Sequence, residues 1–156
     1  NKLMQTEINK IKTLIAETTN GNNWTGINAT QALQNISAQK AVKRINENHL
    51  NIAELTTHLT CWNKVITKRL DAENYQPTNE EDFPEINELS KEEWNTLKEK
   101  FFQSFEILIN KLQEKEGNDV NAPIFEGASS AYRNLHGQIS HLHYHLGQIV
   151  LLKKIV

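Results

Sequence analysis

The chain has 156 residues, of which 17 are basic and 19 acidic, so its formal net charge is −2 at pH 7. This length suits one compact domain, residues 1–156. The near-balanced charge excludes a strongly electropositive nucleic-acid-binding protein, and we expect no nucleic-acid partner. The single cysteine excludes a disulfide framework and a zinc module built from several cysteines.

Hydropathy gives no sign of a membrane protein. The apolar run from Ile149 to Leu152 is interrupted by Lys153, whereas a transmembrane helix needs about 20 consecutive apolar residues. The first residues also lack the charged and apolar regions of a signal peptide. We therefore expect a soluble, cytoplasmic protein without a membrane partner.

The first fifty residues predict one long helix and two short ones. Aliphatic residues recur with helical spacing over residues 2–19, and Asn20 and Gly21 favour a helix end because they tolerate positive φ. Residues 28–35 and 37–44 are predicted as short helices. The aliphatic positions of the first helix are Leu3, Ile8, Ile11, Leu14 and Ile15.

A second long helix is predicted over residues 51–71. Asn51 stands three positions before Glu54, the spacing of a capping box, in which each side chain bonds the backbone N–H of the other residue. Residues 74–89 are polar, acidic and interrupted by prolines. This composition predicts a solvated connector without a role in chemistry. The apolar stripe of the helix is Ile52, Leu55, Leu59, Trp62, Ile66 and Leu70.

Two further long helices complete the predicted fold. Ser90 and Glu93 form a second capping-box pair at the start of a helix over residues 90–115. The last helix covers residues 129–155. Four long helices predict an all-α four-helix bundle, with short extra helices between the first and second long helices.

The last helix is apolar on two faces. Tyr144, Leu151 and Ile155 lie opposite its main apolar stripe. A helix that is apolar nearly all round is normally buried on both sides. Burial within the monomer and burial in a subunit interface both satisfy this pattern, and the second predicts a homodimer.

Four of the six histidines lie close together in the last helix. His141 and His145 are four residues apart, so both project from one face, and two imidazoles at this spacing can chelate one metal ion. The alternative is a pair of polar residues on a wet face. His136 and His143 lie on the other edge of the apolar stripe at a poorer spacing, which favours ordinary polar or interface roles.

His58 is the natural third ligand. It lies at the edge of the apolar stripe of the second long helix, and metal sites in bundles take ligands from facing helices. Alone, such a histidine is more often a half-buried polar residue. Three neutral imidazoles would leave a divalent ion with an open position, the pattern of catalytic rather than structural zinc. Imidazoles also suit nickel, iron and copper.

Four segments of the sequence form a recognisable pattern. They are Trp24-Thr-Gly, His49-Leu-Asn-Ile-Ala-Glu-Leu, His58-Leu-Thr-Cys-Trp and His141-Leu-His-Tyr-His-Leu-Gly-Gln-Ile. In this order they resemble the DinB/YfiT-like family. The resemblance implies a four-helix bundle, often dimeric, with one divalent metal ion per subunit held at positions that correspond to His58, His141 and His145. Zinc or nickel is expected first, and iron, manganese or copper are alternatives. Characterised relatives include transferases and isomerases that use a low-molecular-weight thiol such as bacillithiol or mycothiol.

Several other polar residues are candidates to support the histidines. Glu54, Gln138 and Gln148 could orient ligands or hydrogen-bond a metal-bound water, although capping already explains Glu54. Cys61 could ligate or attack, but a lone helical cysteine is more often a small buried hydrophobe. Trp62 is interpreted as core packing rather than as part of a substrate pocket.

Three functions remain open from the sequence. The first is a metal-dependent enzyme that activates a low-molecular-weight thiol or water for nucleophilic transfer to a small-molecule substrate. Thiol transfer is narrowly favoured over hydrolysis because no glutamate follows the first ligand as in the His-Glu-x-x-His motif, although an acid from a loop could still act as the general base. The second is a non-catalytic metal-binding or metal-sensing dimer. The third is a helical interaction module without an ion.

Overall fold

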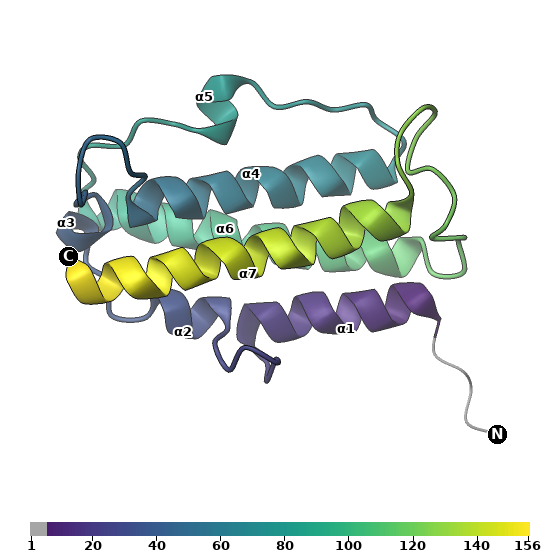
Figure 1. The fold of residues 1–156 in the computed structure, drawn as a ribbon, viewed down its shortest axis with the longest axis horizontal. Helices are drawn as coiled ribbons and strands as arrows, with labels where there is room; N and C mark the ends of the chain where they lie inside the picture. Colours follow the sequence, from purple (N-terminus) through teal and green to yellow (C-terminus); the bar gives the residue numbers. More distant parts are fainter. Residues whose placement is uncertain (1–5) are drawn as a thin grey trace.

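A computed structural model describes residues 6–156, and every regular element in that range is a helix. The long helices are α1 (Glu7–Asn20), α4 (Ile52–Leu70), α6 (Lys91–Glu114) and α7 (Ala131–Ile155). The short helices are α2 (Ala29–Leu33), α3 (Ala38–Ala41) and α5 (Asn79–Asp82). Figure 1 shows the long helices lying along the longest axis of the molecule. The predicted all-α bundle is confirmed, with α2 and α3 between the first two long helices.

The four long helices enclose one core. Helices α1 and α4 each pack against both α6 and α7. Helices α4 and α7 run in opposite directions, as Figure 1 shows, so the end of α4 lies beside the start of α7. Each fully buried leucine or phenylalanine stabilises the fold by about 1.5–3 kcal/mol. The largest fully buried side chains are Trp94, Phe101, Phe105, Ile11, Ile15, Ile52, Leu59, Leu108, Leu112, Leu135, Leu142 and Leu146.

Side-chain caps set the starts of the two helices for which capping boxes were predicted. Asn51 and Glu54 form both bonds of a capping box at the start of α4. Ser90 and Glu93 do the same at the start of α6. Each box satisfies backbone N–H groups that a helix terminus leaves without partners. Both predictions are confirmed, and the first box fixes the start of the helix that carries His58.

The structure differs from the predicted elements in three places. Helix α1 begins at Glu7 rather than at residue 2, because the Thr6 side chain caps it by accepting from the Asn9 N–H; Leu3 of the predicted stripe lies outside the described residues. Helix α3 ends at Ala41, short of the predicted residue 44. Helix α5 forms inside the predicted connector because Thr78 and Glu81 form a capping box. None of the helices in residues 6–156 has the length and apolar character needed to cross a membrane.

Candidate metal centre

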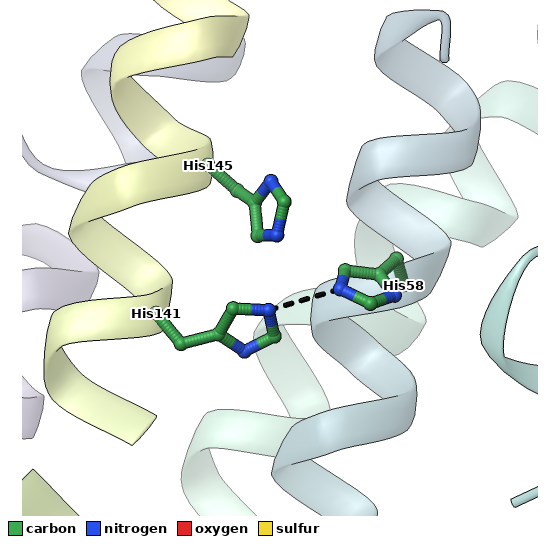
Figure 2. Close-up of side chains that lie close together, drawn as sticks. All are labelled: His58, His141 and His145. Carbon is green, nitrogen blue, oxygen red and sulfur yellow. Dashed lines mark hydrogen bonds between the residues drawn. The ribbon is translucent and has the colours of Figure 1, made fainter. Parts of the chain in front are cut away.

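Three histidines from α4 and α7 converge in the bundle. His58 projects from α4, and His141 and His145 project from successive turns of α7, as Figure 2 shows. Nε2 of His58 lies 2.9 Å from Nε2 of His141. One ring nitrogen from each of the three residues lies within 4.8 Å of the other two. The structure therefore brings together the three histidines that the sequence selected as ligands.

Two glutamines hold the rings of the α7 histidines. Nδ1 of His141 lies 3.2 Å from Oε1 of Gln138, and Nδ1 of His145 lies 2.6 Å from Oε1 of Gln148. An amide oxygen only accepts hydrogen bonds, so each Nδ1 carries the proton and each Nε2 presents a lone pair. Both glutamines were candidate supporting residues, and the structure places both against the ligand rings.

The third histidine is held by the segment predicted to be a solvated connector. Nδ1 of His58 lies 2.7 Å from Oδ1 of Asp82 and 3.0 Å from its backbone oxygen. Trp62 Nε1 donates to the same carboxylate at 2.8 Å, and the Phe83 ring stacks on His58 with centroids 4.7 Å apart. The prediction of a connector that merely faces solvent is wrong, because Asp82 at the end of α5 and Phe83 after it both contact His58.

The arrangement of lone pairs fits a cation. With both Nδ1 atoms protonated, the Nε2 lone pairs of His58 and His141 face each other across 2.9 Å and repel unless a cation or a shared proton lies between them. Burial, with the neighbouring His145 and His58, lowers the pKa of His141 to about 4, so His141 is neutral at neutral pH and its Nε2 lone pair is available to a cation. Tetrahedral zinc with Zn–N bonds of about 2.0–2.1 Å would separate its nitrogen ligands by roughly 3.3 Å.

A cavity of about 530 Å³ opens beside the three histidines. Trp62 lines it, so the interpretation of this residue as core packing alone is wrong. The walls combine aromatic and aliphatic surface with a few polar groups, which is typical of a small-molecule site. The lining residues are His58, Trp62, Ile66, Arg69, Asp82, Phe83, Ser129, Arg133, Asn134, Gly137, Gln138, His141 and His145.

Comparison with protein families agrees with this geometry. The sequence profile of the DinB superfamily matches residues 24–149, a range that contains all three histidines. The chain belongs to the DinB superfamily. No curated protein and no solved structure matched the chain in the parallel comparisons. The family assignment thus rests on the profile match over most of the chain, and the three histidines of this DinB protein are a candidate metal site.

A buried polar chain in this DinB protein fixes the orientation of Gln138. Gln138 Nε2 donates to Asn63 Oδ1 at 2.8 Å, Asn63 Nδ2 donates to Ser104 Oγ at 2.9 Å, and Ser104 Oγ donates to the Phe101 carbonyl at 2.6 Å. A carbonyl only accepts, so this last bond sets the direction of every bond before it. The chain therefore leaves Oε1 of Gln138 free to accept from His141, through contacts that reach helix α6.

Breaking this chain is expected to affect both stability and metal affinity. Asn63→Ala leaves the buried amide of Gln138 and the hydroxyl of Ser104 each short of a partner, which destabilises the protein by about 2–3 kcal/mol. Freed from Asn63, Gln138 holds His141 less firmly, and we expect zinc affinity to fall about tenfold. Denaturant titration and zinc competition measure the two effects. Asn110→Ala, the same change at an exposed position of α6, should alter neither.

The histidine pKa values predict acid sensitivity of the metal-free DinB protein. Burial lowers the pKa of His141 to about 4 and also lowers the pKa of His145 below the ordinary histidine value of 6.5. The unfolded chain then binds more protons, so stability falls as the pH drops through about 6.5 towards 4. Thermal midpoints of the metal-free protein should decrease from pH 7 to pH 5, and less steeply in His141→Gln. A midpoint that rises on acidification would contradict this.

Glu54 does not join the histidines. Its buried carboxylate forms an ion pair with Arg44 and accepts from the backbone N–H groups of Asn51 and Ile86 at 3.1 and 2.9 Å. It stands one turn before His58 in sequence, but these partners turn it towards the start of α4. Glu54 therefore makes no contact that supports a candidate ligand. The carboxylate that bonds His58 belongs to Asp82 instead.

The remaining candidates lie away from the ligand nitrogens. His143 faces α1, where Nε2 lies 3.1 Å from Thr18 Oγ1, and His136 packs on the Tyr132 ring with centroids 4.2 Å apart. Cys61 is buried, and burial raises the pKa of its thiol to about 11, which keeps it protonated at neutral pH. Such a thiol is a poor ligand and nucleophile.

Proposed function

We propose that this protein is a metal-dependent enzyme that activates a low-molecular-weight thiol for nucleophilic transfer to an electrophilic small molecule. The observation that carries the proposal is the set of three imidazoles lining an open cavity. A bound divalent ion would supply Lewis acidity that lowers the pKa of a thiol or a water molecule. Zinc or nickel is the proposed ion, one per chain, and iron, manganese and copper also bind imidazole ligands.

The residues around the cavity support thiol transfer over hydrolysis. Hydrolysis would need a carboxylate free to accept a proton from water. The carboxylate that lines the described cavity belongs to Asp82, and its Oδ1 is already shared by His58 and Trp62. A thiol needs less help because its pKa starts near 8.5. In the proposed step the thiol proton leaves to solvent, sulfur forms a bond to carbon, and the leaving group departs with its electron pair.

The test is a conjugation assay with several thiols and metals. Protein loaded with zinc or nickel is incubated with 1-chloro-2,4-dinitrobenzene and bacillithiol, mycothiol or cysteine, and aryl thioether and chloride are both measured. We expect at least one thiol to react faster than with His141→Ala protein. No metal-dependent conjugation with any thiol would contradict the proposal. Metal-dependent ester hydrolysis in place of conjugation would identify the hydrolase alternative. If the metal-loaded protein shows neither activity, a binding or sensing role is favoured.

We also propose that the protein is a homodimer that works in the reducing cytoplasm, where free thiols persist. Tyr144, Leu151 and Ile155 on the outer face of α7 are 65%, 58% and 56% exposed in the single chain. Apolar groups that gather on one face favour burial against a partner. Sedimentation of the wild-type protein should give twice the chain mass, and Leu151→Glu should shift it towards the monomer. A monomeric wild-type protein would contradict this.

A further inference from the structure

Two arginines lie at the end of the cavity away from the histidines. Along α7, Arg133, Gly137, His141 and His145 are spaced four residues apart and all line the cavity. A helical rise of 1.5 Å per residue places Arg133 about 12 Å along the axis from His141. On α4, Arg69 lies near the last turn, whereas His58 lies in its first half. Because the two helices are antiparallel (Figure 1), both guanidinium groups belong to the same end.

Neither arginine is neutralised within residues 6–156. The ion pairs of the described chain include Arg44 but neither Arg69 nor Arg133. Arg69 donates to the amide oxygens of Asn134 and Gln76 at 3.1 and 3.4 Å, which carry no charge. Its buried Nε has no hydrogen-bond partner in this range. Arg69 is partly buried, and a partly buried arginine is normally paired with an anion, so its donors indicate a missing acceptor. Arg133 is exposed and lines the same cavity.

The surroundings of Arg69 also indicate that its donors are available to an anion. Its guanidinium lies over the Trp62 ring, 5.7 Å from the centroid, and burial lowers its pKa. The first N–H groups of α7 offer an anion nothing, since they bond the Ala122 and Val120 carbonyls and the Ser130 hydroxyl. Recognition of an anion at this end would therefore rest on the two side chains.

The chemistry of the cavity selects a carboxylate. A guanidinium presents parallel N–H donors that match the two oxygens of a carboxylate, and a partly apolar site strengthens the pair. Between the arginines and the histidines the walls include Trp62 and Ile66, and Gly137 adds no side chain. Phe83 adds apolar surface at the histidine end, where it stacks on His58. A ligand that spans the cavity needs an apolar body between its ends.

We propose that Arg69 and Arg133 bind a carboxylate on the substrate, and that the substrate carries its reacting group at the histidines, which lie about 12 Å further along α7. This inference rests on the proposed function for the role of the histidine end. The substrate class is thus an acid with an apolar middle and a thiol or an electrophilic carbon at its other end. A guanidinium pair also binds phosphate, so the test includes both oxyanions.

Four matched probes separate the two ends of the site. 6-Mercaptohexanoate, 6-mercaptohexanol, hexanoate and hexanol differ only in the presence of the thiol and of the carboxylate. Their affinities are measured by calorimetry with zinc-loaded and metal-free protein, together with hexyl phosphate. We expect each acid to bind about tenfold or more tightly than its alcohol, with and without zinc, because a charge-assisted pair has that strength. Hexyl phosphate should bind more weakly than hexanoate.

Variants assign the preference to the two arginines. Arg69→Gln and Arg133→Gln should each remove most of the difference between acid and alcohol while leaving alcohol affinity and zinc content unchanged. Lys154→Gln removes one positive charge from the exposed far end of α7 and should leave the difference intact. Equal binding of acid and alcohol by the wild-type protein, or a preference that survives the double arginine variant, would overturn the inference. If hexyl phosphate binds more tightly than hexanoate, the group that the two arginines recognise is a phosphate and not a carboxylate. If the thiol probes bind zinc-loaded protein no more tightly than the probes without a thiol, that result would instead contradict the proposed function.

Discussion

His58→Ala is expected to lower zinc affinity more than about 100-fold, since loss of even an outer hydrogen-bond partner typically costs 10- to 100-fold. The variant removes the ligand contributed by α4 and leaves two nitrogens on a single helix. Competition with a chromophoric chelator measures the affinity directly. The helical fold should survive, because the buried aliphatic side chains of α4, such as Ile52 and Leu59, are unchanged. The variant loses the bond of the imidazole to Asp82 and its stack on Phe83.

His143→Ala is the matched control for the ligand variants. His143 stands between His141 and His145 in sequence, but its ring contacts Thr18 on α1. Its removal should leave zinc affinity within about twofold of the wild-type value, a change of less than 0.5 kcal/mol. Equal losses of affinity in His58→Ala and His143→Ala would show that the ion binds elsewhere or that both variants act through misfolding.

Gly137→Leu is expected to block the cavity while leaving the metal site and the fold intact. Gly137 lies one turn before His141 on the cavity wall, and a Cβ added there would meet no atom within 4 Å. A leucine side chain therefore extends into the free volume. Replacing a glycine in a helix should stabilise the protein by about 0.5–1 kcal/mol. Affinity for 6-mercaptohexanol should fall at least about tenfold, a loss of roughly 1.4 kcal/mol.

The second helical glycine of α7 supplies the control. Gly147 is exposed, an added Cβ would also meet no atom within 4 Å, and the residue does not line the cavity. Gly147→Leu should give a similar gain in stability with unchanged probe affinity and zinc content. If Gly137→Leu binds the probe as tightly as Gly147→Leu, the cavity is not the ligand site.

The bundle was predictable because its signals are local. Apolar spacing sets each helical face, and the cap pairs at Asn51 and Ser90 set helix starts, so neither feature depends on distant contacts. The pairing of His141 with His145 follows from one helical turn. The participation of His58 required knowledge of which helices face each other, and here the family resemblance supplied what spacing alone left open.

Residues that act across long sequence separations were harder to find. Asp82 reaches His58 from 24 positions away, on a connector whose acidic composition is equally typical of a solvated loop. The capping-box pair Thr78 and Glu81 was a readable sign of local order there. The role of Asn63 could not be predicted, because the sequence does not distinguish a buried polar residue in a helix from an exposed one. Only packing of three helices creates its partners.

The most direct test of the account is X-ray absorption spectroscopy of the zinc-loaded protein at one equivalent of metal. We predict three imidazole nitrogens at about 2.0–2.1 Å, with the outer-ring scattering of histidine, and the loss of one imidazole in His58→Ala. A zinc ion with fewer than three imidazole ligands in the wild-type protein, or a spectrum unchanged by His58→Ala, would contradict the convergence of His58, His141 and His145 on one cation.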